Sequence, residues 1–264
     1  MENLEQMTNK SILIIGNLGY IGPVAARHFR ENYPGIILRG YDIGYFMQQY
    51  TRGGLVGETC LNTQHFGDVR HFDEKALEDI DAVIYLAAIS NDPMGNVFEQ
   101  PTLDINYHAA FAIAQKAKMK GVRNFVFASS CSVYGFADTV PRTEASEVNP
   151  LTAYAQSKVY TERELRTLAD SDFKITCLRY ATACGFSDRL RLDLVLNDFV
   201  AAAMVDKKIT ILSDGTPWRP LIHVKDMSRA MDWGCTREDD SDFIIINTGS
   251  NTWNYQVKDL AYAV

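Results

Sequence analysis

The sequence lacks the features that mark a membrane protein, a disulfide-bonded protein or a nucleic-acid-binding protein. Its five cysteines include no C-x-x-C pair and show no metal-ligand spacing, so we expect reduced thiols and no metal site. No apolar run approaches the roughly 18 residues that a membrane span needs. With a net charge of −7, the chain also lacks the positive excess that attracts nucleic acid or an anionic membrane surface. These absences predict a cytoplasmic protein.

What is present is an alternation of short apolar runs and helix-like segments along the 264 residues. Apolar runs such as 11–15, 82–88 and 124–128 have the length and composition of buried parallel strands. Segments such as 103–120 and 151–165 have the length and residue types of helices. This alternation predicts the α/β fold class, with a doubly wound parallel sheet.

Three glycines follow the first apolar run in the pattern G-x-x-G-x-x-G. Gly16, Gly19 and Gly22 come directly after 11–15, and residues 23–30 continue as a helix. Glycines here permit a tight turn and let the backbone approach a pyrophosphate, which the N–H groups of the helix N-terminus can bind. An ordinary glycine turn is the alternative, but the order of strand, turn and helix favours a dinucleotide site.

Acidic residues end the next two predicted strands. Asp42 comes 20 residues after Gly22, where a carboxylate can bond ribose hydroxyls and would repel a 2′-phosphate. This position favours NAD over NADP, although Arg39 is close in sequence and a plain turn aspartate is the alternative. Asp68 ends a third short strand at 64–69 and suits an adenine amino group.

A tyrosine and a lysine four residues apart lie on a predicted helix. Residues at this spacing share one helix face, so Tyr154 and Lys158 would project side by side. A nearby ammonium group lowers the pKa of a phenol, which makes it a better base near neutral pH. Alone, the pair also fits a solvated helix face. Ser130 and Ser132, upstream, could simply satisfy a strand end.

Together, these elements resemble the extended short-chain dehydrogenase/reductases that act on nucleotide sugars, the NAD-dependent epimerase/dehydratase group. The resemblance covers roughly residues 10–264 and rests on the three glycines, Asp42, Gly67-Asp68-Val69, Leu86-Ala87-Ala88, Asn106, Ser129-Ser130-Cys131-Ser132-Val133-Tyr134-Gly135, Tyr154-x-x-x-Lys158, Arg179-Tyr180 and the stretch from Trp218-Arg219-Pro220 to Asp226. It implies a Rossmann domain that binds NAD and a small mixed α/β substrate lobe.

The resemblance also implies roles for individual residues. Ser130 and Tyr154 would share the substrate hydroxyl, with Lys158 supporting Tyr154 and bonding the nicotinamide ribose. The cofactor would lie against Gly16, Gly19, Tyr20, Ile21, Gly22, Asp42, Asp68, Val69, Leu86, Ala87, Ala88, Asn106, Lys158 and Tyr180. The nucleotide-diphosphate sugar would lie against Ser90, Ser132, Thr182, Arg189, Asn197 and Arg219, with Arg191 as a further candidate. His223 is expected to be a buried structural residue bonded towards Asp226, and Trp218 and Trp253 are expected to be packing residues.

Two departures from the family pattern narrow the reaction. Cys131 and Ser132 stand where the 4,6-dehydratases carry an Asp-Glu pair, which argues against dehydration, and Thr182 stands where many epimerases carry asparagine. The predicted function is an NAD-dependent nucleotide-sugar epimerase that acts by hydride transfer through a 4-keto sugar, with Tyr154 as base. The alternatives are a nucleotide-sugar dehydrogenase or 4-ketoreductase with the same three residues, or a non-catalytic NAD-binding regulator.

The resemblance divides the chain into two unequal parts. Residues 1–180 are expected to form the NAD-binding domain, to which a later segment at about 220–250 returns, and residues 181–264 to form mainly the sugar-nucleotide lobe. A strand is expected at 209–212. Family members usually continue further, so a C-terminally truncated lobe is expected. Helices 103–120 and 152–169 pair across a dimer in similar proteins, which implies a homodimer.

Overall fold

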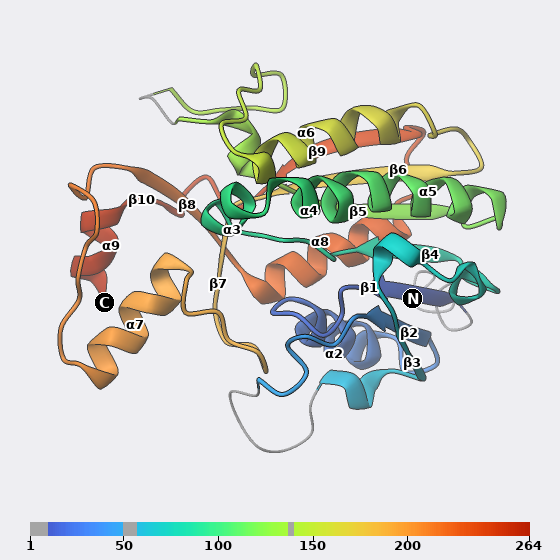
Figure 1. Ribbon diagram of the computed structural model, residues 1–264, viewed down its shortest axis with the longest axis horizontal. Coiled ribbons are helices and arrows are strands. Elements are labelled where there is room, and N and C mark those ends of the chain that lie inside the picture. The colour runs from blue at the N-terminus through green and yellow to red at the C-terminus, as the bar shows by residue number, and fades with distance from the viewer. Residues whose placement is uncertain (1–9, 50–56, 137–139) are drawn as a thin grey trace.

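A computed structural model describes residues 10–49, 57–136 and 140–264 of the chain (Figure 1). It places a seven-stranded parallel sheet between two layers of helices, with a small three-stranded sheet and two further helices at one end. This arrangement confirms the predicted fold class, a doubly wound parallel sheet with a small mixed lobe. Within the described ranges, no helix has both the length and the apolar character that crossing a membrane requires.

The main sheet has the strand order β3-β2-β1-β4-β5-β6-β9, and every neighbouring pair is parallel. Its strands are β1 (Ser11–Ile15), β2 (Ile37–Asp42), β3 (Thr63–Phe66), β4 (Ala82–Tyr85), β5 (Asn124–Ser130), β6 (Lys174–Tyr180) and β9 (Phe243–Thr248). The strand order reverses between β1 and β4, and open α/β sheets bind ligands at such a switch point, outside the carboxyl ends of the strands. The ends of β1, β2, β4 and β5 therefore meet at one edge.

The helices form two layers on this sheet. One layer holds α2 (Gly22–Asn32) and α8 (Val224–Thr236), and the other holds α3 (Asp92–Val97), α4 (Glu99–Leu103), α5 (Ala110–Met119) and α6 (Ala153–Arg166). Short 3-10 helices span Gly57–Cys60, Val69–His71, Glu74–Leu77 and Cys131–Tyr134. The predicted helix at 103–120 is not uniform, because a π-helical segment, Asp104–Ala109, precedes α5.

Alternate residues of β1 face opposite helical layers. Leu13 and Ile15 belong to a buried cluster with residues of α5, whereas Ile12 and Ile14 belong to a second cluster with residues of α2 and α8. Because both faces of the strand are covered, Ile12, Leu13, Ile14 and Ile15 are all fully buried. This explains the continuous apolar run that predicted the strand.

The small lobe is built around a second sheet, in the order β10-β8-β7. In this sheet β7 (Thr182–Cys184) runs parallel to β8 (Trp218–His223), and β10 (Asn254–Gln256) runs antiparallel to β8. Helices α7 (Val195–Val205) and α9 (Val257–Ala263) bury the apolar side of this lobe. The strand predicted at 209–212 is wrong, because these residues form no strand and Leu212 is 97% exposed. The side chains of Ile209 and Ile211 pack against the lobe's core instead.

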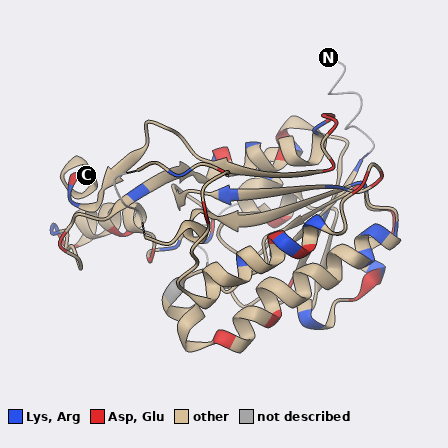
Figure 2. Cartoon of the chain, turned by 90° about the horizontal axis from the view of Figure 1, so that it is seen from above, with Lys and Arg blue, Asp and Glu red and all other residues tan. Residues whose placement is uncertain are grey.

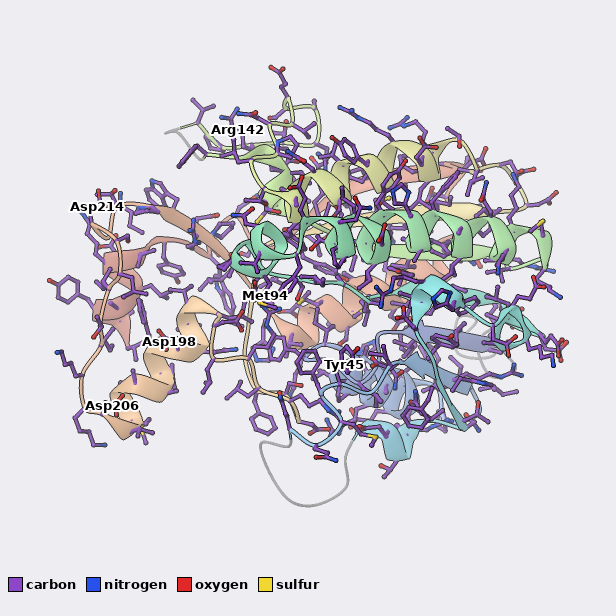
Figure 3. The ribbon with its side chains drawn as sticks, viewed as in Figure 1. Tyr45, Met94, Arg142, Asp198, Asp206 and Asp214 are labelled. Carbon is purple, nitrogen blue, oxygen red and sulfur yellow. The ribbon has the colours of Figure 1, made fainter. Side chains whose placement is uncertain are left out.

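Charged side chains lie mainly on the helices and the connecting segments. Figure 2 shows residues of both signs interspersed along the helices that cover the sheet. On the small lobe, the exposed Asp198, Asp206 and Asp214 lie on its outer side (Figure 3). These carboxylates therefore face solvent, away from the main sheet.

Candidate functional site

The glycine turn between β1 and α2 begins the site. Gly16 has a φ of +87°, and a Cβ there would lie 2.7 Å from the Cα of Ala87, beyond the end of β4. A Cβ on Gly22 would lie 2.5 Å from the carbonyl carbon of Asn17. Both positions therefore require glycine for backbone packing alone. A Cβ on Gly19 would meet only the Gly16 carbonyl oxygen, at 3.5 Å, so this glycine leaves open space beside the turn.

The turn and the helix after it fit the diphosphate of a dinucleotide. No side chain caps the N-terminus of α2, and Pro23 stands in its first turn. Pro23 carries no N–H, and the N–H groups of Val24 and Ala25 donate to the Ile21 carbonyl at 3.1 Å, so an anion would be bound by the N–H groups of the turn before Pro23, next to the space that Gly19 leaves open. Ile21 is the N-cap residue, and the phenol of Tyr20 donates to the Gly185 carbonyl at 2.6 Å. The residues present thus fit the NAD that the motif predicts.

The acid at the end of β2 lies against the same turn. One carboxylate oxygen of Asp42 accepts from the backbone N–H of Leu18 at 3.0 Å, and the other accepts from that of Gly44 at 2.8 Å. Its carboxylate therefore lies beside the glycine turn, where the predicted ribose contact requires it. Asp68 instead accepts from the N–H and the guanidinium of Arg70. These bonds lower the pKa of Asp68, and its adenine contact stays a prediction.

The segment after β4 forms the wall next to the turn. The backbone N–H groups of Leu86 and Ala87 both donate to the Ile15 carbonyl, at 2.8 and 3.0 Å. This bond pattern brings Leu86, Ala87 and the following Ala88 close to Gly16. The small side chains of the two alanines leave room beside the glycine turn for the dinucleotide that the motif predicts.

Two predicted cofactor ligands have buried side chains that are bonded to other parts of the protein. Asn106 is fully buried in the π-helical segment, and its amide bonds both the N–H and the carbonyl of Ile89 at 2.9 Å. Asn106 therefore positions the loop after β4. The phenol of Tyr180 donates to the Met227 carbonyl of α8 at 3.2 Å, and burial raises its pKa well above the ordinary value. Contact of Asn106 or Tyr180 with the cofactor stays a prediction.

The three predicted catalytic residues come from the end of β5 and from α6. Lys158 is buried, and its ammonium nitrogen lies 5.4 Å from the centre of the Tyr154 ring, so the two side chains do lie together on the helix. The same nitrogen donates to the Ala128 carbonyl at 2.7 Å. Ser130 accepts from the hydroxyl of Ser132 at 2.9 Å. These contacts place the tyrosine and lysine of α6 beside the strand end that carries Ser130.

Burial and a neighbouring carboxylate act in opposite directions on Lys158. Burial lowers the pKa of Lys158 to about 7, and Glu162, one helical turn further along α6, opposes this by favouring the ammonium form. A lysine with a pKa near neutrality can carry its charge when a proton leaves a nearby phenol. The site therefore holds a tyrosine next to a cation whose charge depends on its surroundings.

A buried ion pair lies behind Lys158. Glu162 accepts two hydrogen bonds from Arg179 of β6, at 2.7 and 3.0 Å, and one from the hydroxyl of Ser129 at 2.5 Å. Arg179 also donates to the phenol of Tyr134 at 2.9 Å. We did not expect Glu162 from the sequence. The sequence does contain a signal for it, namely Arg179 in an apolar strand, because a buried arginine needs a buried acid as partner.

Two of the predicted substrate residues meet between the main sheet and the small lobe. Arg191 donates to the hydroxyl of Ser90 at 2.9 Å and pairs with Asp193 at 2.6 Å. Asn197, near the start of α7, bonds the Gly185 N–H at 3.0 Å and the phenol of Tyr20 at 3.3 Å. Asn197 therefore ties α7 directly to the glycine turn.

The three candidate arginines differ in burial: Arg189 is buried, Arg191 is half-buried and Arg219 is exposed. Arg189 is 3% exposed, and its guanidinium pairs with Glu58 and donates to the Phe46 carbonyl at 2.8 Å. The role of Arg189 as a substrate ligand stays a prediction. Arg219 is exposed on β8, where it donates to the Trp218 carbonyl at 3.0 Å. Thr182 is half-buried on the neighbouring β7. Substrate contacts by Arg219 and Thr182 stay predictions.

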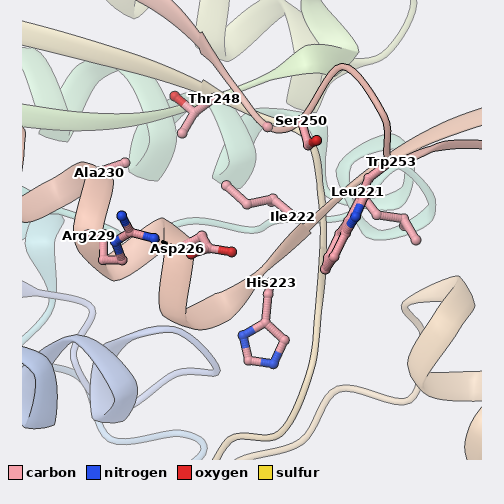
Figure 4. Close-up of a pocket in the computed structure, with 10 residues that line it drawn as sticks. Leu221, Ile222, His223, Asp226, Arg229, Ala230, Thr248, Ser250 and Trp253 are labelled. Carbon is pink, nitrogen blue, oxygen red and sulfur yellow. Dashed lines mark hydrogen bonds and ion pairs between the residues drawn. The ribbon is translucent and has the colours of Figure 1, made fainter.

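A cavity of about 530 Å³ lies between β8, the start of α8 and the segment after β9, and none of the predicted catalytic residues lines it (Figure 4). His223 and Asp226 line it, but His223 accepts from the Lys225 N–H, so the expected bond towards Asp226 is not formed. Trp253 also lines it, and both Trp253 and Trp218 of β8 are 42% exposed.

Comparisons with known proteins agree with this geometry. The family model described as "NAD dependent epimerase/dehydratase family" matches residues 12–249. The chain is 30% identical over 245 residues to UDP-glucose 4-epimerase 2 of Arabidopsis thaliana, which covers 83% of this chain and 69% of that relative. It is 28% identical over 235 residues to the UDP-glucose 4-epimerase of Lactobacillus helveticus, covering 82% and 69%.

A solved structure shows the same arrangement of elements. MoeE5 in complex with UDP-glucose and NAD superimposes with a TM-score of 0.80 and 26% sequence identity, over 95% of this chain and 79% of MoeE5. The matched residues include the glycine turn, Asp42 and the residues Ser130, Tyr154 and Lys158, which lie within 12–249. The chain therefore belongs to the NAD dependent epimerase/dehydratase family, a family of enzymes whose cofactor is NAD.

Proposed function

We propose that this chain is a nucleotide-sugar epimerase that inverts a sugar carbon through a 4-keto intermediate, with Tyr154 as the base. The observation that carries the proposal is the position of Tyr154 beside the buried ammonium of Lys158, next to the strand end with Ser130. The relatives support it, since the two described above are UDP-glucose 4-epimerases. A UDP-sugar is accordingly the proposed substrate.

In this proposal each residue of the site has its own role in the reaction. Ser130 donates to the substrate hydroxyl and orients it towards Tyr154, which takes the proton. Lys158 holds positive charge beside the phenolate and so stabilises it. NAD, held by the glycine turn and Asp42, supplies hydride acceptance and return. Tyr154 then gives the proton back to the oxygen after the sugar has presented its other face.

The residues after Ser130 favour epimerisation over dehydration. Expelling water from the sugar needs an acid and a base near its C5 and C6 atoms. Cys131 and Ser132 occupy the positions in question, and the Ser132 hydroxyl bonds Ser130. Because this pair offers no carboxylate, we propose reversible oxidation at one carbon as the whole reaction.

The small lobe is the proposed binding site of the nucleotide. Ser90 and Arg191 meet at its border with the main sheet, and Asn197 and Arg219 lie on α7 and β8. Residues 1–180, with α8 and β9, would then form the NAD-binding domain. We further propose a homodimer through α5 and α6. Sedimentation of the protein, with a charge placed at the exposed Met119 as the disrupting variant, tests that assembly.

The experiment uses UDP-glucose, UDP-N-acetylglucosamine and UDP-glucuronic acid as substrates. Products are separated by chromatography and identified by NMR, while absorbance at 340 nm follows NADH. An epimer without net NADH supports the proposal, whereas stoichiometric NADH without an epimer would replace it with a dehydrogenase. Tyr154→Phe is expected to lower turnover by roughly 10²–10⁴-fold while NAD binding persists. The matched control is Tyr160→Phe, on the same helix, which should keep full activity.

A further inference from the structure

The buried pair of Glu162 and Arg179 lies directly behind the proposed catalytic residues. Both side chains are almost fully buried, with exposures of 3% and 5%. A buried ion pair of this kind contributes little net stability compared with apolar residues of the same size. Its presence so close to the site therefore suggests a different role, which the contacts around it define.

We propose that Glu162 is a positioning residue that holds the end of β5 in place and keeps Lys158 charged, and that Arg179 fixes Glu162 in that position. The proposal rests on the proposed function, because it concerns the same tyrosine and lysine. It assigns to Glu162 a part in the reaction without any contact to substrate or cofactor.

Three consecutive residues of β5 connect the pair with the reaction. The carbonyl of Ala128 accepts from Lys158 at 2.7 Å, the hydroxyl of Ser129 donates to Glu162 at 2.5 Å, and Ser130 is the proposed substrate ligand. Lys158 and Glu162 are one helical turn apart on α6. The strand end is therefore fastened to the helix at two adjacent points, immediately before the residue that must face Tyr154.

The forked contact from Arg179 fixes the direction of the carboxylate. Its two bonds reach both oxygens of Glu162, and one of these oxygens, Oε1, also accepts the bond from Ser129. Arg179 is itself held by the phenol of Tyr134, which donates to the side-chain oxygen of Asn247 in β9 at 2.6 Å. The network thus connects five elements, namely α6, β5, β6, the 3-10 helix Cys131–Tyr134 and β9.

The titratable groups that face Lys158 come from two elements. On α6 these are Tyr154 and Glu162, and on β6 they are Cys177 and, beyond Glu162, Arg179. From β5, Lys158 contacts the Phe127 ring and the Ala128 carbonyl, neither of which titrates. Burial raises the pKa of Cys177 well above its ordinary value, so the thiol is neutral. Among the residues that the structure describes, Glu162 is thus the carboxylate that favours the ammonium form of Lys158.

The test compares Glu162→Gln with Ser129→Ala. Glutamine keeps the shape and one acceptor but removes the charge, so Lys158 loses its proton more easily and supports the Tyr154 phenolate less. The acid limb of kcat against pH is expected to move up by about one pH unit, with turnover falling roughly tenfold at pH 7 and recovering at pH 9. Ser129→Ala keeps both charges and should lower kcat without moving the limb. An unmoved limb in Glu162→Gln would overturn the proposal.

A second measurement separates this proposal from the proposed function. The ionisation of Tyr154 is followed at 295 nm in the NAD-bound protein, as the difference from Tyr154→Phe, and needs no substrate. Glu162→Gln should raise that ionisation pH even if no sugar is turned over. Should Glu162→Gln fail to fold, Glu162→Gln with Arg179→Met removes both buried charges and is expected to fold. If Tyr154 ionises at the same pH in this double variant as in the wild type, the proposed role of Glu162 is refuted.

Discussion

Two glycines of the same turn are expected to respond differently to alanine. Gly16 has a positive φ, and a Cβ there would overlap the backbone at Ala87, which cannot rotate away. Gly19 has no such φ, and its Cβ would contact only the Gly16 carbonyl oxygen at 3.5 Å. Gly16→Ala therefore damages the fold, whereas Gly19→Ala leaves the fold intact and places a methyl group where the cofactor's diphosphate should lie.

The magnitudes follow from these contacts. A non-glycine residue held at such a φ costs roughly 1–3 kcal/mol, to which the overlap at Gly16 adds. In a domain of this size each kcal/mol lowers the midpoint of thermal unfolding by roughly 2–4 °C. Gly16→Ala should therefore unfold about 5 °C or more below the wild type without NAD. Gly19→Ala should unfold within about 2 °C of the wild type, since alanine introduces no comparable strain.

The assay is thermal unfolding with and without NAD. A ligand at 100 times its dissociation constant stabilises the folded state by about 2.7 kcal/mol, which corresponds to a rise of roughly 5–10 °C. We expect this rise in the wild type and its loss in Gly19→Ala. The reasoning is refuted if Gly19→Ala keeps the full NAD-induced rise, or if it destabilises the cofactor-free protein as much as Gly16→Ala does.

Three further predictions follow from buried or charged groups. Lys158→Met should stabilise the cofactor-free protein at pH 6–7 by on the order of a few kcal/mol, because burial lowers the pKa of Lys158 to about 7 and penalises its charged form. Between pH 7 and the ordinary lysine pKa of 10.5, the unfolded chain holds a proton on Lys158 that the folded chain has lost, so wild-type stability should rise with pH. Urea unfolding should therefore show that the stability advantage of Lys158→Met over the wild type vanishes above pH 10.5. Asp42→Asn removes the charge that repels a 2′-phosphate, and calorimetric titration should show the preference for NAD over NADP falling by about tenfold. Arg237→Met deletes a buried bond to Thr176 at 2.8 Å and a partly buried one to Asp239 at 2.6 Å, and should cost about 2–4 kcal/mol in denaturant unfolding with the NAD-induced rise unchanged.

The parts of the site that depend on local sequence could be predicted. The spacing of Gly16, Gly19 and Gly22 fixes a turn within seven residues, and the spacing of Tyr154 and Lys158 fixes one helix face. In both cases the geometry depends on the backbone of a single turn or helix. Distant residues cannot alter it without breaking that element.

The roles of Asn106 and Arg189 depend on distant partners and could not be predicted in this way. Asn106 bonds the loop at Ile89 because a π-helical segment rotates its amide inward, and sequence periodicity does not report that rotation. Arg189 pairs with Glu58, which lies 131 residues earlier in the chain. An arginine near a predicted anion site and an arginine with a buried acid as partner look alike until the two segments are placed side by side.

The position of β9 at the edge of the sheet has a consequence for the order of folding during synthesis. β6 ends at Tyr180, but its outer edge stays unpaired until β9, Phe243–Thr248, has been made. At roughly 5–20 residues per second, the ribosome needs several seconds to reach that strand. During this interval the backbone edge of β6 is open to wrong partners. Because β9 also supplies Asn247 to Tyr134, the network behind the reactive lysine is completed by the last strand of the main sheet.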